Sequence, residues 1–160
     1  MISNINTHPP INVNTVVLSF GSNLGQKKQN ILSAYDLLER RLGRKIKNSD
    51  FFETEAWGFV SEESFINTCA VFTTSHNPQE CLIIINDIER ELGRIRSGQA
   101  GYEDRIIDID ILFYNNCIID DINLKIPHPL LHLRQFVLLP LKQIIPDYVH
   151  PVLNKKISDI

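Results

Sequence analysis

The chain has 160 residues, of which 43% are hydrophobic and 22% are charged, and its formal net charge at pH 7 is −3. These values are ordinary for one soluble globular domain with a sizeable core, and we expect that domain to cover residues 15–160. An acidic chain lacks the basic field that favours nucleic acid or anionic membranes, so we expect neither partner. Any anion site must therefore come from locally clustered Arg and Lys.

The three cysteines form no C-x-x-C pair, which argues against a disulfide framework or a zinc site. The N-terminal segment MISNINTHPPIN has neither a basic start nor an apolar run, so we expect no signal peptide. No stretch approaches the roughly 20 apolar residues of a membrane span. We expect a cytoplasmic protein in which residues 1–14 form a flexible extension.

The first half of the chain alternates between strand and helix patterns. Residues 16–20 form a short apolar run, which predicts a buried strand. Apolar residues then recur at helical spacing over residues 26–42, and Gly43 is placed to end that helix. Residues 45–56 and 65–74 read as two further strands.

The second half begins with a strong helix start, since Asn77 offers an N-cap and Pro78 and Glu80 suit the first turn. The later elements predicted are a helix that ends near Leu92, a strand over 106–114, a hairpin partner over 117–119 and a helix over 135–145. This order favours an α+β fold, a ferredoxin-like βαββαβ sandwich with a C-terminal helical and hairpin extension. A doubly wound parallel sheet would need stricter alternation of strand and helix.

Two carboxylates share one face of the strand over 106–114. Side chains alternate along a strand, so Asp108 and Asp110 lie together, roughly 7 Å apart, flanked by Ile106 and Leu112. The opposite face carries Ile107, Ile109, Ile111 and Phe113. Paired carboxylates suit Mg²⁺, which keeps several waters and takes further oxygens from a nucleotide. The alternative is a half-exposed strand whose outer face is acidic.

Arginines lead directly into this acidic strand. Arg94, Arg96 and Arg105 bracket a glycine-containing loop over residues 94–104. The planar fork of Arg donates parallel hydrogen bonds to phosphate, and a metal–triphosphate site needs such cations beside paired acids. The alternative is that these arginines pair with neighbouring surface acids, namely Glu91, Glu103 and Asp104.

Other polar segments are less specific. Gly21-Ser22-Asn23 lies between a strand and a helix but matches neither common phosphate-binding glycine motif, which favours a plain turn. His128 and Arg134 carry groups able to bind phosphate. Phe136 is either a core residue or a stacking platform, and spacing does not decide between the two.

Taken together, these segments resemble the 6-hydroxymethyl-7,8-dihydropterin pyrophosphokinase family of folate biosynthesis over residues 16–146. The matching pieces are Gly21-Ser22-Asn23-Leu24, Phe51-Phe52-Glu53-Thr54, Phe65-Ile66-Asn67, Ile88-Glu89-Arg90-Glu91-Leu92-Gly93-Arg94-Ile95-Arg96, Arg105-Ile106-Ile107-Asp108-Ile109-Asp110, and Pro127-His128-Pro129 with Arg134-Gln135-Phe136-Val137-Leu138-Leu139-Pro140-Leu141. One departure is Tyr102-Glu103-Asp104-Arg105, where the family commonly has an aromatic residue followed by Gly-Pro-Arg.

The resemblance implies an ATP-dependent pyrophosphokinase, a diphosphotransferase that moves pyrophosphate from ATP to the hydroxymethyl group of the pterin and releases AMP. It implies that Asp108 and Asp110 bind two Mg²⁺ ions and act in catalysis with Arg94, Arg96 and Arg105. The ATP-binding residues it implies are Asn86, Glu89, Arg94, Arg96, Arg105, Ile111, His128 and Arg134. The pterin-binding residues it implies are Thr54, Trp57, Phe65, Asn67 and Phe136. We expect a monomer.

An RNA-binding module and a non-catalytic regulatory domain are the two alternatives to this enzyme. A ferredoxin-like RNA-binding module would carry an aromatic RNP-like strand and a basic face, and this acidic chain has no such pattern. A regulatory domain that binds a small ligand without catalysis would have no need of the intact Asp108/Asp110 pair with its arginines. Magnesium-dependent ATP binding with AMP release separates all three.

Overall fold

The computed structural model describes residues 13–54, 64–94 and 104–160. Its main sheet is antiparallel, with the strand order β2-β4-β1-β5 and with β3 paired to β4. The strands are β1 (Asn14–Ser22), β2 (Gly43–Asn48), β3 (Phe52–Thr54), β4 (Phe65–Thr74) and β5 (Asp108–Tyr114). Of the extension expected over residues 1–14, residues 1–12 lie outside the described residues, and Asn14 already begins β1.

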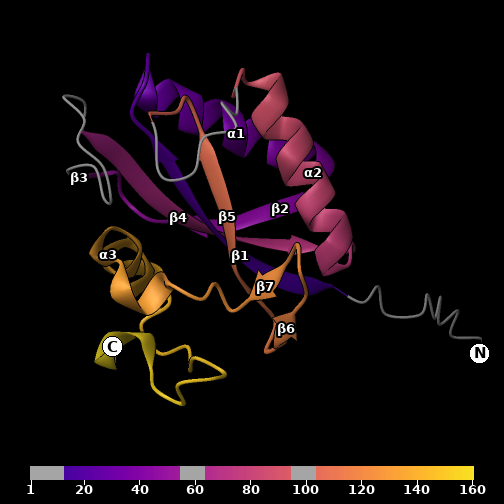
Figure 1. Ribbon diagram of the computed structural model, residues 1–160, viewed down its shortest axis with the longest axis vertical. Coiled ribbons are helices and arrows are strands. Elements are labelled where there is room, and N and C mark those ends of the chain that lie inside the picture. The colour runs from indigo at the N-terminus through magenta and orange to yellow at the C-terminus, as the bar shows by residue number, and fades with distance from the viewer. Residues whose placement is uncertain (1–12, 55–63, 95–103) are drawn as a thin grey trace, which may run out of the picture.

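Two helices cover one face of this sheet and a third packs on the other. Figure 1 shows α1 (Lys27–Arg41) and α2 (Pro78–Glu91) side by side on one face, with α3 (Gln135–Ile144) on the opposite face. Along the chain, β1, α1, β2, β4, α2 and β5 follow one another in the order βαββαβ. The first and third of these strands, β1 and β4, lie at the centre of the sheet. The predicted ferredoxin-like α+β fold is confirmed.

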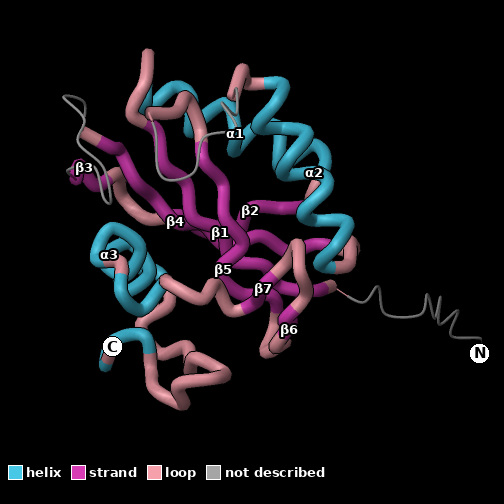
Figure 2. Tube along the Cα trace, in the orientation of Figure 1, coloured by secondary structure: helices cyan, strands magenta, loops and turns pink. Residues whose placement is uncertain are grey.

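The C-terminal part adds the predicted third helix and a small hairpin. The hairpin is a separate two-stranded sheet, so the prediction that residues 117–119 pair with the preceding strand is wrong. The hairpin pairs β6 (Ile119–Asp120) with β7 (Lys125–Ile126), and the short helices η1 (Leu131–Leu133) and η2 (Ile157–Asp159) flank α3 (Figure 2). Among the residues that the structure describes, no helix is long and apolar enough to cross a membrane.

The core divides into two apolar clusters, one on each face of the sheet. Alternation along β1 shows the division, because Val16, Leu18 and Phe20 pack in the cluster under α1 and α2, whereas Val17 packs in the cluster under α3.

The ends of the first two helices follow local chemistry. The side chain of Asn77 accepts from the backbone N–H of Glu80, which confirms the predicted N-cap of α2. The Glu80 carboxylate in turn accepts from the backbone N–H of Asn77, which makes the cap reciprocal. Gly43 does not merely follow α1 but begins β2. A Cβ on Gly43 would lie 1.8 Å from the carbonyl oxygen of Thr73, so this glycine permits a close approach of two strands.

The prediction of one strand over residues 45–56 is wrong. The strand is broken after Asn48, and β3 resumes at Phe52. Ser49 causes the break, because its Oγ accepts from the backbone N–H of Cys69 at 3.0 Å and lies 2.9 Å from Thr68 Oγ1. Such side-chain bonds compete with a regular strand ladder.

The predicted face of Phe113 is also wrong. Along β1 and β5, Leu18 pairs with Ile111 but Val17 pairs with Phe113, so Leu112 is an additional residue in β5. This β-bulge places Leu112 and Phe113 together in the cluster under α3, while Ile111 stays in the cluster under α1 and α2.

Candidate active site

Strand register places the predicted metal ligands and the predicted pterin residue Asn67 in adjoining rows of the sheet. Asp108 pairs with Gly21, and Gly21 pairs with Asn67, so these residues form one row across β5, β1 and β4. Asp110 pairs with Ser19 in the next row on the same face. With strands about 4.8 Å apart, the backbones of Asn67 and Asp108 are separated by roughly 10 Å.

Gly21 leaves the middle of the first row without a side chain. A Cβ on Gly21 would lie 3.2 Å from Asn67 Oδ1 and 3.5 Å from Phe65 Cδ1. The missing side chain keeps a gap on the sheet surface between the amide of Asn67 and the carboxylate of Asp108. The expectation of a plain turn over Gly21-Ser22-Asn23 is wrong, because Gly21 and Ser22 are the last two residues of β1.

A cavity of about 300 Å³ lies over the acidic end of this row. Its walls come from α2, β5 and the segment before α3. The lining residues are Leu82, Asn86, Glu89, Arg94, Arg105, Asp108, Ile109, Asp110, His128 and Arg134. Ile111 lines an adjoining cavity of about 250 Å³, which shares with the first cavity the residues Leu82, Ile109, Asp110 and His128. The structure thus brings together the residues predicted to bind ATP and metal, except Arg96, which lies outside the described residues.

Arg94 and Arg105 both bind the carboxylate of Asp108. Arg94 Nη1 lies 2.9 Å from Asp108 Oδ1, and Arg105 Nη1 lies 3.1 Å from Asp108 Oδ2. The pairing of Arg94 and Arg105 with Asp108 directs these cations into the cavity. Glu91 instead pairs with Arg41 on the surface.

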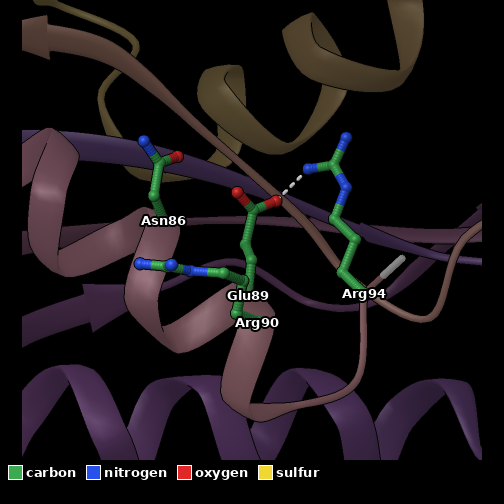
Figure 3. A pocket seen from close by; sticks show the side chains of 4 residues that line it. All are labelled: Asn86, Glu89, Arg90 and Arg94. Carbon is green, nitrogen blue, oxygen red and sulfur yellow. Dashed lines mark hydrogen bonds and ion pairs between the residues drawn. The ribbon is translucent and has the colours of Figure 1, made fainter. Parts of the chain in front are cut away.

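Glu89 organises this ion-pair network from beneath. Its side chain is buried, pairs with Arg94, and accepts from the backbone N–H of Ile109 at 3.2 Å. Figure 3 shows Glu89 and Asn86 rising from α2, with Arg94 reaching back to the Glu89 carboxylate from just beyond the helix. These residues and Arg90 line a further cavity of about 470 Å³. Burial raises the pKa of Glu89, and the nearby Arg94 opposes that rise.

Asp110 lies where its ionised form is destabilised. Burial, followed by repulsion from Asp108, raises the pKa of Asp110 to about 7, while Arg134 and Arg94 act in the opposite direction. A cation beside Asp108 and Asp110 would relieve this destabilisation. Within the described ranges, no group of three or more His, Cys, Asp or Glu side chains is arranged to hold a metal. The pair still fits Mg²⁺, because one or two carboxylates suffice when water and substrate phosphates supply the other oxygens.

His128 presents a neutral ring to the cavity. Burial and the neighbouring Arg134 lower the pKa of His128 to about 4. Its Nδ1 accepts from the backbone N–H of Leu130 at 3.2 Å, so the proton of the neutral ring resides on Nε2. The ring is thereby prepared to donate one hydrogen bond to an anionic oxygen.

Asn23 is a site residue whose role the sequence pattern did not reveal. Its buried side chain donates to Asp104 Oδ1 at 2.6 Å and accepts from the backbone N–H of Arg105 at 2.7 Å. Its own backbone N–H donates to the carbonyl of Arg105 at 3.1 Å. Asn23 therefore fixes the backbone from which Arg105 reaches Asp108. A strand-to-helix motif without a phosphate pattern gives no signal for such a long-range bond.

Three of the residues predicted to bind the pterin, namely Thr54, Phe65 and Asn67, lie at the other end of the row. Asn67 is buried and its Nδ2 donates to Thr54 Oγ1 at 2.6 Å. Phe136 is half-buried and packs against the cluster under α3. The centre of its ring lies 5.7 Å from the guanidinium carbon of Arg134. Phe136 is thus both a core contact and a neighbour of the phosphate-side residues. Trp57 lies outside the described residues.

Comparison with known proteins identifies the family. Residues 17–146 match the sequence profile of 7,8-dihydro-6-hydroxymethylpterin-pyrophosphokinase (HPPK). The chain is 41% identical over 138 residues to the 2-amino-4-hydroxy-6-hydroxymethyldihydropteridine pyrophosphokinase of Porphyromonas gingivalis, covering 85% of this chain and 93% of that protein. The match to the Aquifex aeolicus protein of the same name is 40% over 145 residues and covers 91% and 89%.

Longer proteins also contain a region like this chain. The chain is 42% identical over 142 residues to the Folic acid synthesis protein FOL1 of Dictyostelium discoideum, of which it spans 21%. Among solved structures, wild-type HPPK-DHPS of Plasmodium falciparum with pteroate matches with a TM-score of 0.76 and 23% identity, covering 92% of this chain and 41% of that one. This structural likeness supports the fold, and the sequence matches carry the assignment. The chain therefore belongs to the HPPK family of ATP-dependent diphosphotransferases of folate biosynthesis.

Proposed function

We propose that this chain transfers pyrophosphate from ATP to the hydroxymethyl oxygen of 6-hydroxymethyl-7,8-dihydropterin in a Mg²⁺-dependent reaction that releases AMP. The observation that carries this proposal is the row across the sheet. The amide of Asn67 lies at one end, the carboxylate of Asp108 lies at the other, and Gly21 leaves space between them. A pterin edge and a polyphosphate can therefore meet over Gly21.

Asp108 and Asp110 would hold the magnesium, with two ions proposed for the full site. A Mg²⁺ ion held by these carboxylates would supply positive charge that neutralises and orients the ATP phosphates. The raised pKa of Asp110 supports this assignment, because a cation between Asp108 and Asp110 would stabilise their ionised forms.

The cations of the cavity bind the phosphate oxygens that the metal ions would not coordinate. Arg94 and Arg105 offer planar forks of N–H donors, and Arg134 adds a third positive charge near His128. The Nε2 proton of His128 gives a neutral donor beside them. Asn86 and Ile111, together with the apolar walls of the adjoining cavity, lie on the nucleotide side. Arg96 is included among the proposed phosphate-binding residues because of its place in the sequence motif shared with the family.

The pterin binds at the Asn67 end in this proposal. A pterin has a flat π-face and an edge of donors and acceptors. The Asn67 amide and the Thr54 hydroxyl suit the edge, and the rings of Phe136 and Phe65 suit the face. Trp57 completes the proposed set from its position in the sequence.

The chemistry then needs no protein nucleophile. The hydroxymethyl oxygen attacks the β-phosphorus of ATP in line. The bond that breaks joins the β-phosphorus to the oxygen bridging the α- and β-phosphorus atoms. The pterin gains a diphosphate ester, AMP leaves with the bridging oxygen, and the hydroxyl proton is released. Catalysis comes from holding the reactants in position and from stabilising the charge that develops.

The decisive test is the identity of the nucleotide product. The protein is incubated with ATP, Mg²⁺ and 6-hydroxymethyl-7,8-dihydropterin, and the products are separated by ion-exchange chromatography. We expect equal amounts of AMP and pterin diphosphate, and none without Mg²⁺. Accumulation of ADP with a pterin monophosphate would contradict the proposal. We further propose that the active species is a cytoplasmic monomer with no nucleic-acid partner, which size-exclusion chromatography of the active fraction and cell fractionation can check.

A further inference from the structure

The two elements that flank the proposed pterin site are short or interrupted. Thr54 lies on β3, which has three residues and pairs with β4. Phe136 lies in the first turn of α3, where Pro140 lacks the N–H that would bond the carbonyl of Phe136. Neither element is held in place by its own backbone bonds alone, so contacts at their ends matter for the gap between them.

One pair of hydrogen bonds joins α3 to Asp50, which lies in the connection between β2 and β3, two residues before β3 begins. The backbone N–H of Asp50 donates to Gln143 Oε1 at 2.7 Å, and Gln143 Nε2 donates to Asp50 Oδ2 at 2.6 Å. Both polar atoms of the Gln143 amide are used, and each has the complementary partner. We call this closed pair of bonds the Asp50–Gln143 clasp.

The clasp lies at a joint that is already fixed to the sheet. Asp50 follows Ser49, whose Oγ accepts from the backbone N–H of Cys69 and contacts Thr68 Oγ1. Ser49 thus anchors the break between β2 and β3 to β4, and Asp50 extends that anchor to the last turn of α3. Gln143 and Phe136 are about two helical turns apart and share one face of α3.

From this geometry we infer that Asp50 and Gln143 are positioning residues of the pterin site. The clasp fixes α3 relative to β3 and so sets the gap between Phe136 and Thr54. This inference rests on the proposed function, since it concerns the same pterin site. Neither residue lines the cavity over Asp108 and Asp110, so loosening the clasp alters the pterin end and leaves the nucleotide end in place.

The bonds also allow a test by exchange of donor and acceptor. Gln143→Glu places two carboxylates face to face and opens the clasp by repulsion. Asp50→Asn alone keeps it, because the amide oxygen at that position still accepts from Gln143 Nε2. The double variant restores a complementary pair with the donor on the opposite side. Gln29→Glu is the matched control, since Gln29 is an exposed residue of α1 whose amide bonds Ser33.

The experiment measures the Kd of 6-hydroxymethyl-7,8-dihydropterin with Mg²⁺ and a non-hydrolysable ATP analogue present, and separately the Kd of the analogue. For Gln143→Glu we expect the pterin Kd to rise about three- to tenfold, the range for losing one hydrogen bond and adding repulsion. The analogue Kd should stay within about twofold. Asp50→Asn, the double variant and the Gln29→Glu control should bind pterin like the wild-type protein. Hydrogen exchange at the β3 amides should quicken in Gln143→Glu alone.

The outcomes distinguish a failure of the positioning role from a failure of the proposed function. A folded Gln143→Glu protein with normal pterin affinity would overturn the clasp as a positioning device, as would equal weakening of both ligands or a double variant that fails to recover. Wild-type protein that binds no pterin would instead overturn the proposed function, and the positioning role with it.

Discussion

Replacing either carboxylate of the acidic strand tests the metal assignment directly. Asp108→Asn and Asp110→Asn keep the size of the side chain and remove its charge. Under the proposed metal assignment, each change removes one metal–oxygen bond and part of the charge that attracts the cation. We expect turnover at saturating Mg²⁺ to fall on the order of a thousandfold, which corresponds to a barrier increase of about 4 kcal/mol.

The same substitution at Asp110 should have the opposite effect on stability without metal. The pKa of Asp110 rises from 3.8 to about 7 in the folded protein, mainly through burial. An acid with a raised folded pKa costs nothing at low pH, where both states are protonated, and its full cost is present above pH 7, where both states are ionised. That cost is at most about 4 kcal/mol, since each pKa unit corresponds to about 1.4 kcal/mol.

The measurable gain is smaller than this upper limit, because the Asn side chain must itself find hydrogen bonds in the same place. For Asp110→Asn we expect about 1–3 kcal/mol of added stability at pH 8 in EDTA, and little change at pH 4. For a chain of this length, each kcal/mol raises the melting temperature by about 2–4 °C. Thermal melts at both pH values, with and without Mg²⁺, measure the gain.

Asp36→Asn serves as the control, since Asp36 is an exposed acid on α1 that pairs with Arg40. It should change neither turnover nor the pH dependence of the melt. If a folded Asp108→Asn or Asp110→Asn protein kept turnover within about threefold of normal, the barrier would have risen by less than ~1 kcal/mol. That is too little for a metal ligand, and the acidic-surface alternative would then hold for that residue.

Three further outcomes follow from the geometry. Phe136→Ala should weaken pterin binding about tenfold and leave ATP binding nearly unchanged by titration calorimetry, and equal loss of both would make Phe136 a core residue only. Gly21→Ala should raise the KM for pterin, because the new methyl would lie 3.2 Å from Asn67 Oδ1, and an unchanged KM would show that the gap is not used. Burial lowers the pKa of His150, whose Nδ1 accepts two backbone N–H bonds, so stability should fall as pH drops through the unfolded value of about 6.5. Urea unfolding of His150→Gln at pH 5 and pH 7.5 should show a smaller difference than the wild-type protein, and an equal difference would refute the assignment.

Local patterns predicted the parts of the fold whose causes are local. The cap at Asn77 and the alternation that places Asp108 beside Asp110 depend on neighbouring residues, and both are present in the structure. The break at Ser49 depends on bonds to β4, and the anchor at Asn23 depends on a backbone segment some eighty residues away. No periodicity within a short window contains such information.

The residues proposed to bind the pterin were predicted from the family resemblance and not from a local sequence pattern. Nothing in the spacing of Thr54, Asn67 and Phe136 distinguishes them from ordinary strand and core residues, and the resemblance to the family supplied them. The structure adds the contacts that connect them, from Asn67 to Thr54 and from Phe136 to Arg134. Gln143 and Asp50 had no signal at all, because a bond between an exposed amide and a distant backbone N–H has no sequence pattern.

The bulge at Leu112 explains how one sheet face serves both packing and chemistry. Between Asp108 and Ile111, β5 keeps a regular register with β1, so Asp108 and Asp110 face the cavity. A one-residue slip would turn both carboxylates into the core under α1 and α2. Past Ile111 the bulge keeps Leu112 on the cavity-side face and brings Phe113 onto it as well, where α3 covers both residues. The first half of this face is therefore polar and open and its second half is apolar and closed, and the change occurs within a single strand. Because α3 packs on the closed half, Phe136 at its first turn is brought beside Arg134 and the open half, which joins the core of the domain to the proposed pterin site.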